Sequence, residues 1–194
     1  MSESPLTARQ LRSEEAAVLA DLAAIYDDLR FVLGCCERLL ADRQDPVVAE
    51  SLWVAALSTY ARCFRDRKSA LSARDVADTP LKGEVAQWHE LLGKLRDFVV
   101  DDVANLREEY FVGVSETPAG KPAGIVVTSI PRPTVDETTV RQTGRLAYEL
   151  SVVVDNRIKE QTEKVFDGAR QLTAKEFAKL SPIDVDWSPT MSCQ

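Results

Sequence analysis

The stretch LRDFVVDDVANLREEY, residues 95–110, holds the densest group of side chains that could do chemistry. It places Arg96 and Asp97 on an expected helix and follows them with the adjacent acids Asp101 and Asp102. A guanidinium can bind a phosphate, and a carboxylate can transfer a proton. Neighbouring residues of a helix point about 100° apart, so Asp101 and Asp102 cannot face each other as an acid/base pair.

This stretch resembles the motif helix of the HEPN superfamily, the higher eukaryotes and prokaryotes nucleotide-binding domains. The family's motif is an Arg, usually followed by a polar residue, and a His four to six places later. Arg96 and Asp97 stand in the matching positions, and Asp102 stands where the family has its His. The resemblance covers Asp45 to about Val114. It implies a helical bundle that often works as a dimer, in bacterial toxin–antitoxin or phage-defence settings.

The replacement of the His matters chemically. In intact members the resemblance implies metal-independent ribonuclease activity, with the His in proton transfer and the Arg on phosphate. An exposed Asp has a pKa of roughly 3.9, so Asp102 is a poor proton donor at neutral pH and repels a phosphate. We therefore predict a non-catalytic helical interaction protein of HEPN-like ancestry.

The alternative is a metal-independent ribonuclease or nucleotide-binding enzyme with Arg96, Asp97 and Asp102 as its catalytic residues. Its basic rim would be Arg62 with Arg65 and Arg67, and RNA is a partner only under this alternative. The same basic cluster also suits the end of a helix, where cations are favoured. We prefer that second interpretation of the cluster.

No metal or cofactor is expected. The chain has one histidine, His89, and the residue three before it is Ala86, so the ExxH motif of di-iron bundles is absent. His89 lies between apolar positions and is interpreted as a half-buried structural residue. The four cysteines form no CxxC motif, which favours buried thiols in a reducing compartment. These cysteines are Cys35, Cys36, Cys63 and Cys193.

Four aromatic residues recur at helical spacing in the first half of the chain and could line a ligand pocket. Aromatic residues in such a pattern more often form a helical core, which we favour. The four are Trp53, Tyr60, Phe64 and Trp88.

The composition of the chain limits the classes of protein to which it can belong. The chain has 194 residues, 45% of them hydrophobic and 28% charged, which is enough for one domain with a core. Its net charge of -7 opposes nucleic-acid binding. No apolar run reaches the roughly 18 residues that cross a bilayer, and the N-terminus does not read as a signal peptide. We expect a cytoplasmic protein without a membrane partner.

The elements that position these side chains are mostly helices. Residues 1–106 are predicted to form a helical bundle with apolar side chains at three- and four-residue steps. Asp45–Pro46 and Thr79–Pro80 each combine a capping residue with a proline at the first helical position, so each predicts a helix start.

Residues 107–133 read as a β-hairpin. Two β-type runs, Tyr110–Val114 and Ile125–Ile130, flank a loop rich in Gly and Pro. An isolated two-stranded hairpin is marginal in water. This hairpin must therefore pack on the helices or on a second copy of the chain.

Residues 134–180 are predicted to form a long C-terminal helix, and residues 181–194 a loose tail. Apolar residues recur at sevens along the helix, from Val140 to Leu172, which suits packing on the bundle or on a dimer mate. The predicted fold is mainly α: an antiparallel helical bundle with a β-hairpin insertion and a long C-terminal helix. We expect a homodimer, and a separate protein partner is also possible.

Overall fold

The structure is a computed structural model that describes residues 8–41, 45–65, 69–100, 105–132 and 134–183. The described chain is mainly helical with one long hairpin, as predicted. Its helices are α1 (Glu14–Ala41), α2 (Pro46–Arg62), α3 (Ala73–Ala77), α4 (Val85–Val100), α5 (Glu137–Arg170) and α6 (Ala174–Lys179). Its strands are β1 (Ala8–Arg9), β2 (Glu108–Glu116), β3 (Pro122–Pro131) and β4 (Pro182–Ile183).

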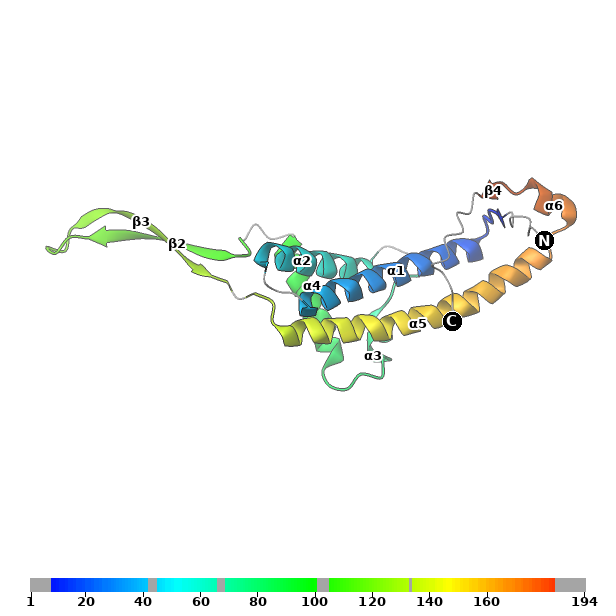
Figure 1. Cartoon of the computed structure of the whole chain (residues 1–194), viewed down its shortest axis with the longest axis horizontal. Coiled ribbons are helices and arrows are strands. Elements are labelled where there is room, and N and C mark those ends of the chain that lie inside the picture. The colour runs from blue at the N-terminus through cyan, green and yellow to red at the C-terminus, as the bar shows by residue number, and fades with distance from the viewer. Residues whose placement is uncertain (1–7, 42–44, 66–68, 101–104, 133, 184–194) are drawn as a thin grey trace.

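Helices α1 and α5 form the axis of the molecule and run antiparallel, side by side (Figure 1). A Cβ at Gly144 of α5 would lie 3.3 Å from the Cβ of Cys36 on α1, so the missing side chain lets the two helices approach closely. Helix α2 packs against α1, and α4 packs against α2. The core lies between these four helices.

The apolar residues that recur every seven positions along α5 pack against the core of the same chain. Val140, Ala147 and Val154 are completely buried in the core, and Ile158 packs against it. The long helix therefore packs on its own bundle along this part of its length, and these residues do not offer a surface to a dimer mate.

Helix ends follow the local chemistry of the chain at two places, of which the first was predicted above. The carboxylate of Asp45 accepts hydrogen bonds from the backbone N–H groups of Val47 and Val48, which caps α2. Thr173 and Glu176 form a reciprocal capping box at the start of α6.

The predicted helix start at Thr79–Pro80 is wrong. Helix α4 begins at Val85, and residues 80–84 form a loop. Gly83 has a φ of 100°, a left-handed conformation that interrupts a helix, and the Thr79 hydroxyl donates to the carbonyl of Val76 instead of capping a new helix. The loop becomes one wall of a pocket described below.

The prediction of a loose tail over residues 181–194 is wrong for its first residues. Residues Pro182 and Ile183 form β4, which pairs antiparallel with β1 near the other end of the chain. The guanidinium of Arg9 donates a hydrogen bond to the carbonyl of Leu180 at 2.6 Å and stabilises this pairing of the two strands. Residues 184–194 lie outside the described part of the chain.

The hairpin of β2 and β3 projects from one end of the helices (Figure 1). It is attached at its base by two contacts. Arg107 forms an ion pair with Glu50 of α2 at 3.0 Å, and the guanidinium of Arg132 lies over the ring of Phe98 of α4, 5.5 Å from its centroid. No helix in the described part of the chain is long and apolar enough to cross a membrane.

Candidate functional site

Arg96 and Asp97 of α4 lie together but are engaged with each other. Nη1 of Arg96 donates to Oδ1 of Asp97 at 2.8 Å, and the Arg96 side chain is only 14% exposed. Asp97 also lies 3.9 Å from a guanidinium nitrogen of Arg65 on the segment after α2. A guanidinium that is paired and largely covered is poorly placed to take a phosphate.

The other predicted members of this site fall into two groups. Asp102, with Asp101 and Arg67, lies outside the described residues. Arg62 bridges to the buried carboxylate of Asp28 on α1, with Nε to Oδ2 at 3.0 Å, and this hydrogen bond raises the pKa of the Arg62 guanidinium. Arg62 thus holds α2 to α1, which agrees with a structural interpretation of the basic cluster.

The side chain of His89 on α4 contacts Tyr60 of α2 and Phe64 just after that helix. Its Nδ1 lies 2.8 Å from the Tyr60 hydroxyl, and its ring centroid is 4.4 Å from that of Phe64. Burial lowers the pKa of His89, so the ring is neutral at pH 7. The half-buried position predicted for His89 is confirmed.

The cysteine side chains in the described part of the chain pack in the core. Cys35 and Cys36 are buried and free, and burial raises the pKa of Cys36 to about 12. Cys63 is also buried, and its thiol donates to the carbonyl of Thr59 at 3.4 Å. Thiols with raised pKa values are weak nucleophiles and weak metal ligands. Across the described ranges, no three His, Cys, Asp or Glu side chains gather as a metal site. Cys193 lies outside these ranges.

The four aromatic residues do not share a pocket. Trp53 and Tyr60 are buried in the core, where Tyr60 contacts Phe64 with ring centroids 5.1 Å apart. Trp88 lines a cavity between the 80–84 loop, α4 and α5, and the other three aromatic residues do not line it. The preference for a core role is therefore correct for Trp53 and Tyr60.

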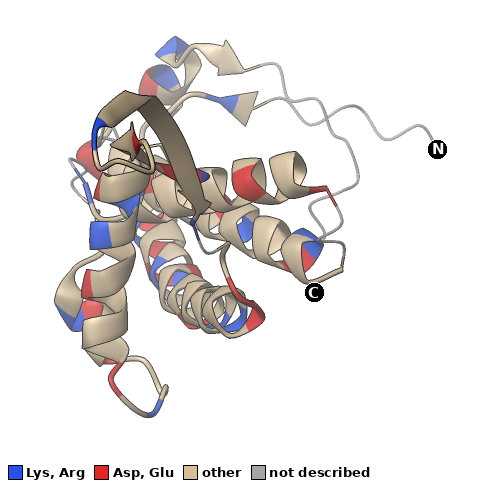
Figure 2. Ribbon diagram, turned by 90° about the vertical axis from the view of Figure 1, so that its left-hand side faces the viewer, with Lys and Arg blue, Asp and Glu red and all other residues tan. Residues whose placement is uncertain are grey.

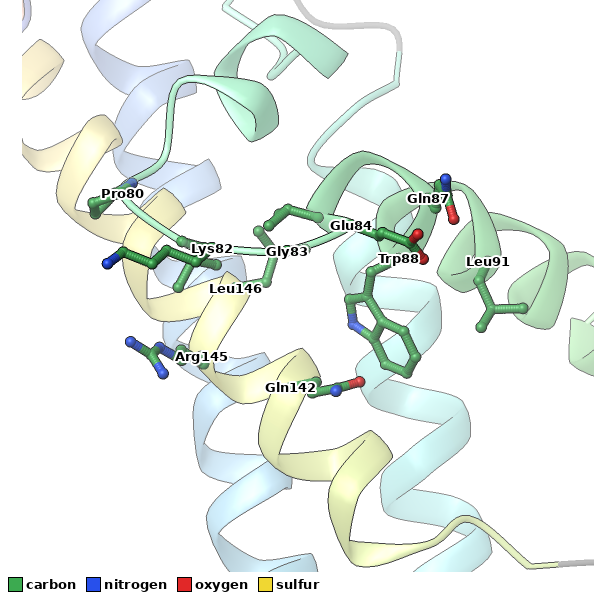
Figure 3. Close-up of a pocket in the computed structure, with 12 residues that line it drawn as sticks. Pro80, Lys82, Gly83, Glu84, Gln87, Trp88, Leu91, Gln142, Arg145 and Leu146 are labelled. Atoms are coloured by element: carbon green, nitrogen blue, oxygen red, sulfur yellow. The ribbon is translucent and has the colours of Figure 1, made fainter.

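The cavity at Trp88 lies between the 80–84 loop, the start of α4 and α5 (Figure 3). Its volume is about 960 Å³. Sequence patterns did not predict it, because the segment was expected to be helix. The one local signal was Gly83, which favours a turn over a helix.

The hairpin carries the largest group of exposed apolar side chains. The register pairs Tyr110 with Ser129, Val112 with Val127 and Val114 with Ile125, so these side chains share one face of the ribbon. The five large apolar members of this group are 59% to 74% exposed: Tyr110, Val112, Val114, Ile125 and Val127. We call these five residues the hairpin face.

The charged residues of the ribbon lie at its two ends. Figure 2 shows Lys, Arg, Asp and Glu spread over the helices. On the hairpin, strand β2 carries Glu108, Glu109 and Glu116, the turn carries Lys121, and strand β3, from Pro122 to Pro131, contains no charged residue. A contiguous apolar surface such as the hairpin face typically marks an interaction site.

Comparison with known proteins adds no further constraint: no protein-family model, no curated protein and no solved structure matches the chain.

Proposed function

We propose that this chain is a non-catalytic interaction protein that self-associates through its hairpin face. The observation that carries the proposal is the hairpin face on the projecting ribbon of β2 and β3, whose five large apolar side chains are exposed. HEPN-like ancestry belongs to the same proposal and rests on the sequence around Arg96 and Asp97. A cytosolic location is also proposed, and the buried, free thiols of Cys35 and Cys36 support it.

The free energy gained by burying apolar side chains favours a partner for the ribbon. Full burial of a Val, Ile or comparable side chain stabilises by roughly 1.5–3 kcal/mol. Covering the exposed part of the hairpin face is therefore worth on the order of 5 kcal/mol per copy. An ion pair at the rim contributes about 0–1 kcal/mol. The apolar face would thus set the affinity.

A second copy of the chain fits this surface. The face is uncharged in its middle, and each ribbon still has an unpaired edge on both strands. Glu108 and Glu109 lie at the base of the hairpin, where Arg132 is 4.0 Å from Glu109, and Glu116 and Lys121 lie at its tip. Each end of the ribbon therefore carries both signs of charge, and the uncharged middle of the hairpin face is the surface that a second copy would cover.

The test compares two variants of adjacent residues on β3. Val127→Glu places a charge on the hairpin face, and Thr128→Glu places the same charge on the opposite face. We expect the wild type and Thr128→Glu to run at twice the chain mass of 21.5 kDa in size-exclusion chromatography with light scattering at tens of micromolar. Val127→Glu should run as a monomer with unchanged circular dichroism.

Three results would contradict the proposal: a strictly monomeric wild type at that concentration, a dimer that survives Val127→Glu, or dissociation by Thr128→Glu to the same extent.

The ribonuclease alternative predicts a different result. If Arg96 served catalysis, metal-free cleavage of a single-stranded RNA would fall by a factor of about 100 or more in Arg96→Ala, as for loss of a transition-state contact. Because Arg96 is paired with Asp97 and largely covered, we expect equal and negligible cleavage by wild type and variant. Arg74→Ala, at an exposed arginine of α3 outside the basic rim of this alternative, is the matched control. Cleavage by wild type that Arg96→Ala abolishes would establish the alternative.

A further inference from the structure

We propose that the cavity beside Trp88 binds a small carboxylate with a flat, apolar body. The cavity is independent of the hairpin face, since the 80–84 loop, α4 and α5 form it (Figure 3). Its volume of about 960 Å³ falls in the range of small-molecule pockets.

One side of the cavity is apolar. Figure 3 shows the indole of Trp88 directed toward α5, with Leu91 beside it. Leu146 of α5 contributes a nearly buried apolar surface, at 1% exposure. A flat ring can pack against these side chains, with the indole providing a stacking surface.

The indole also provides an unused hydrogen-bond donor. Nε1 of Trp88 is buried and has no hydrogen-bond partner among the described residues. Buried donors in native proteins are nearly always paired. An oxygen acceptor on a bound molecule would satisfy this donor while the apolar body of the same molecule covers the ring.

The other side of the cavity is cationic. Lys82 of the loop and Arg145 of α5 lie together on the side away from Leu91 (Figure 3). Neither forms an ion pair with an acid in the described part of the chain, although most other arginines of the bundle do. Glu84 also lines the cavity, near Trp88, so the two cations outnumber the acid. This balance suits one negative charge.

The arrangement selects the class of ligand. A free inorganic anion would meet the cations but leave the indole and Leu91 uncovered. A neutral aromatic molecule would cover these side chains but leave both cations unpaired. A planar carboxylate satisfies both sides, with its charge at Lys82 and Arg145 and its ring at Trp88.

The test uses naphthalene-2-carboxylate and its neutral counterpart of similar shape, 2-naphthamide, in calorimetric titrations of the full chain. We expect the carboxylate to bind at least about tenfold more tightly than the amide, since one charge-assisted interaction is worth about that factor. Arg145→Gln, at an exposed position, should reduce this preference to about twofold or less. Lys164→Gln, an exposed lysine further along α5, is the matched control and should change nothing.

Trp88→Phe keeps a ring but removes the donor, and it should weaken both probes severalfold. Val127→Glu on the hairpin should leave binding unchanged, which separates this proposal from that of self-association. Absence of carboxylate binding at millimolar concentration would overturn the proposal. So would equal binding of the two probes, insensitivity to Arg145→Gln, or loss of binding in Val127→Glu.

Discussion

At the scale of single residues, the polar side chains between the helices are occupied by structural partners. Arg96 is bound by Asp97, Arg62 by Asp28, and the His89 ring by Tyr60. Each contact removes a group that could otherwise react or bind a ligand. The Arg62–Asp28 pair joins α2 to α1 and the His89–Tyr60 contact joins α4 to α2, whereas Arg96 and Asp97 are neighbours on α4.

His89 gives the sharpest pH prediction. Burial lowers its pKa below the usual 6.5, so the unfolded chain binds a proton more readily than the folded chain in the window below 6.5. The stability contributed by neutral His89 is complete above pH 6.5 and is lost as the pH falls through the folded pKa. The ring protons of this single histidine should titrate in nuclear magnetic resonance spectra with a midpoint below 6.5.

The control is His89→Gln, which keeps a polar group facing Tyr60 but does not titrate. Urea unfolding should show a smaller loss of stability between about pH 7.5 and about pH 5.5 in this variant than in the wild type. A midpoint at or above 6.5, or the same pH dependence in both proteins, would refute the assignment.

At the scale of elements, the short helix α3 is held by one carboxylate. Asp75 accepts hydrogen bonds from the backbone N–H and hydroxyl of Ser72, each at 2.8 Å, and forms an ion pair with Arg157 of α5. Burial by itself would raise the pKa of Asp75, but the Ser72 hydrogen bonds and Arg157 together lower it. A single side chain thus caps α3 and joins it to the long helix.

Asp75→Asn should therefore destabilise the fold. Loss of hydrogen bonds to a buried charged group costs about 1.5–3 kcal/mol, and we expect this decrease in the free energy of unfolding at neutral pH. Because the folded pKa lies below 3.8, the contribution of Asp75 is present above that pH and is lost as the pH falls through the folded value. Urea denaturation of wild type and variant measures both effects.

Arg74→Gln is the matched comparison on the same helix. It removes the exposed ion pair of Arg74 with Asp78, which are 3.5 Å apart, and should cost only about 0.3–0.5 kcal/mol. If the two substitutions had equal effects, Asp75 would not hold α3 in the way described.

At the scale of the whole molecule, folding and association are assigned to different parts of the chain. The buried core lies in the helices, and none of its residues comes from β2 or β3. The hairpin projects beyond this core (Figure 1). The helical part should therefore fold without the ribbon, and the ribbon should serve association.

Replacing residues 109–130 with a Gly-Ser linker of about four residues tests this division, because Glu108 and Pro131 are paired neighbours at the hairpin base. The helical circular dichroism signal should remain. The melting temperature of the wild type should rise with protein concentration, as for any native state stabilised by association, whereas that of the shortened chain should not. Loss of the helical signal, or equal concentration dependence in both, would contradict the division.

Local features were predictable because their causes lie within a few residues. The Asp45 cap, the Thr173–Glu176 capping box and the two β-type runs of the hairpin all depend on neighbours in sequence. The start of α4 was not predicted, since Thr79–Pro80 has the chemistry of a helix start while Gly83 takes a left-handed conformation that the loop requires. The pairing of β1 with β4 was also missed, because it joins the two ends of the chain.

The sequence identified residues of the candidate site but did not predict how their side chains are arranged in space. Arg96 and Asp97 were identified from the sequence, yet the coverage of Arg96 and the approach of Arg65 to Asp97 depend on how α4 packs against α2. The pairing of His89 with Tyr60 likewise joins residues 29 positions apart. The Trp88 cavity requires the loop and α5 to meet.

The sequence by itself determined the helices, their caps and the hairpin, because hydrophobic periodicity and turn chemistry act over short distances. Only the tertiary structure decided that α5 buries its seven-residue pattern against α1 and that the apolar ribbon points away from the core. A pattern of apolar residues shows that a surface must be covered, but it does not identify the surface that covers it. That choice depends on the shapes that meet when distant segments pack together.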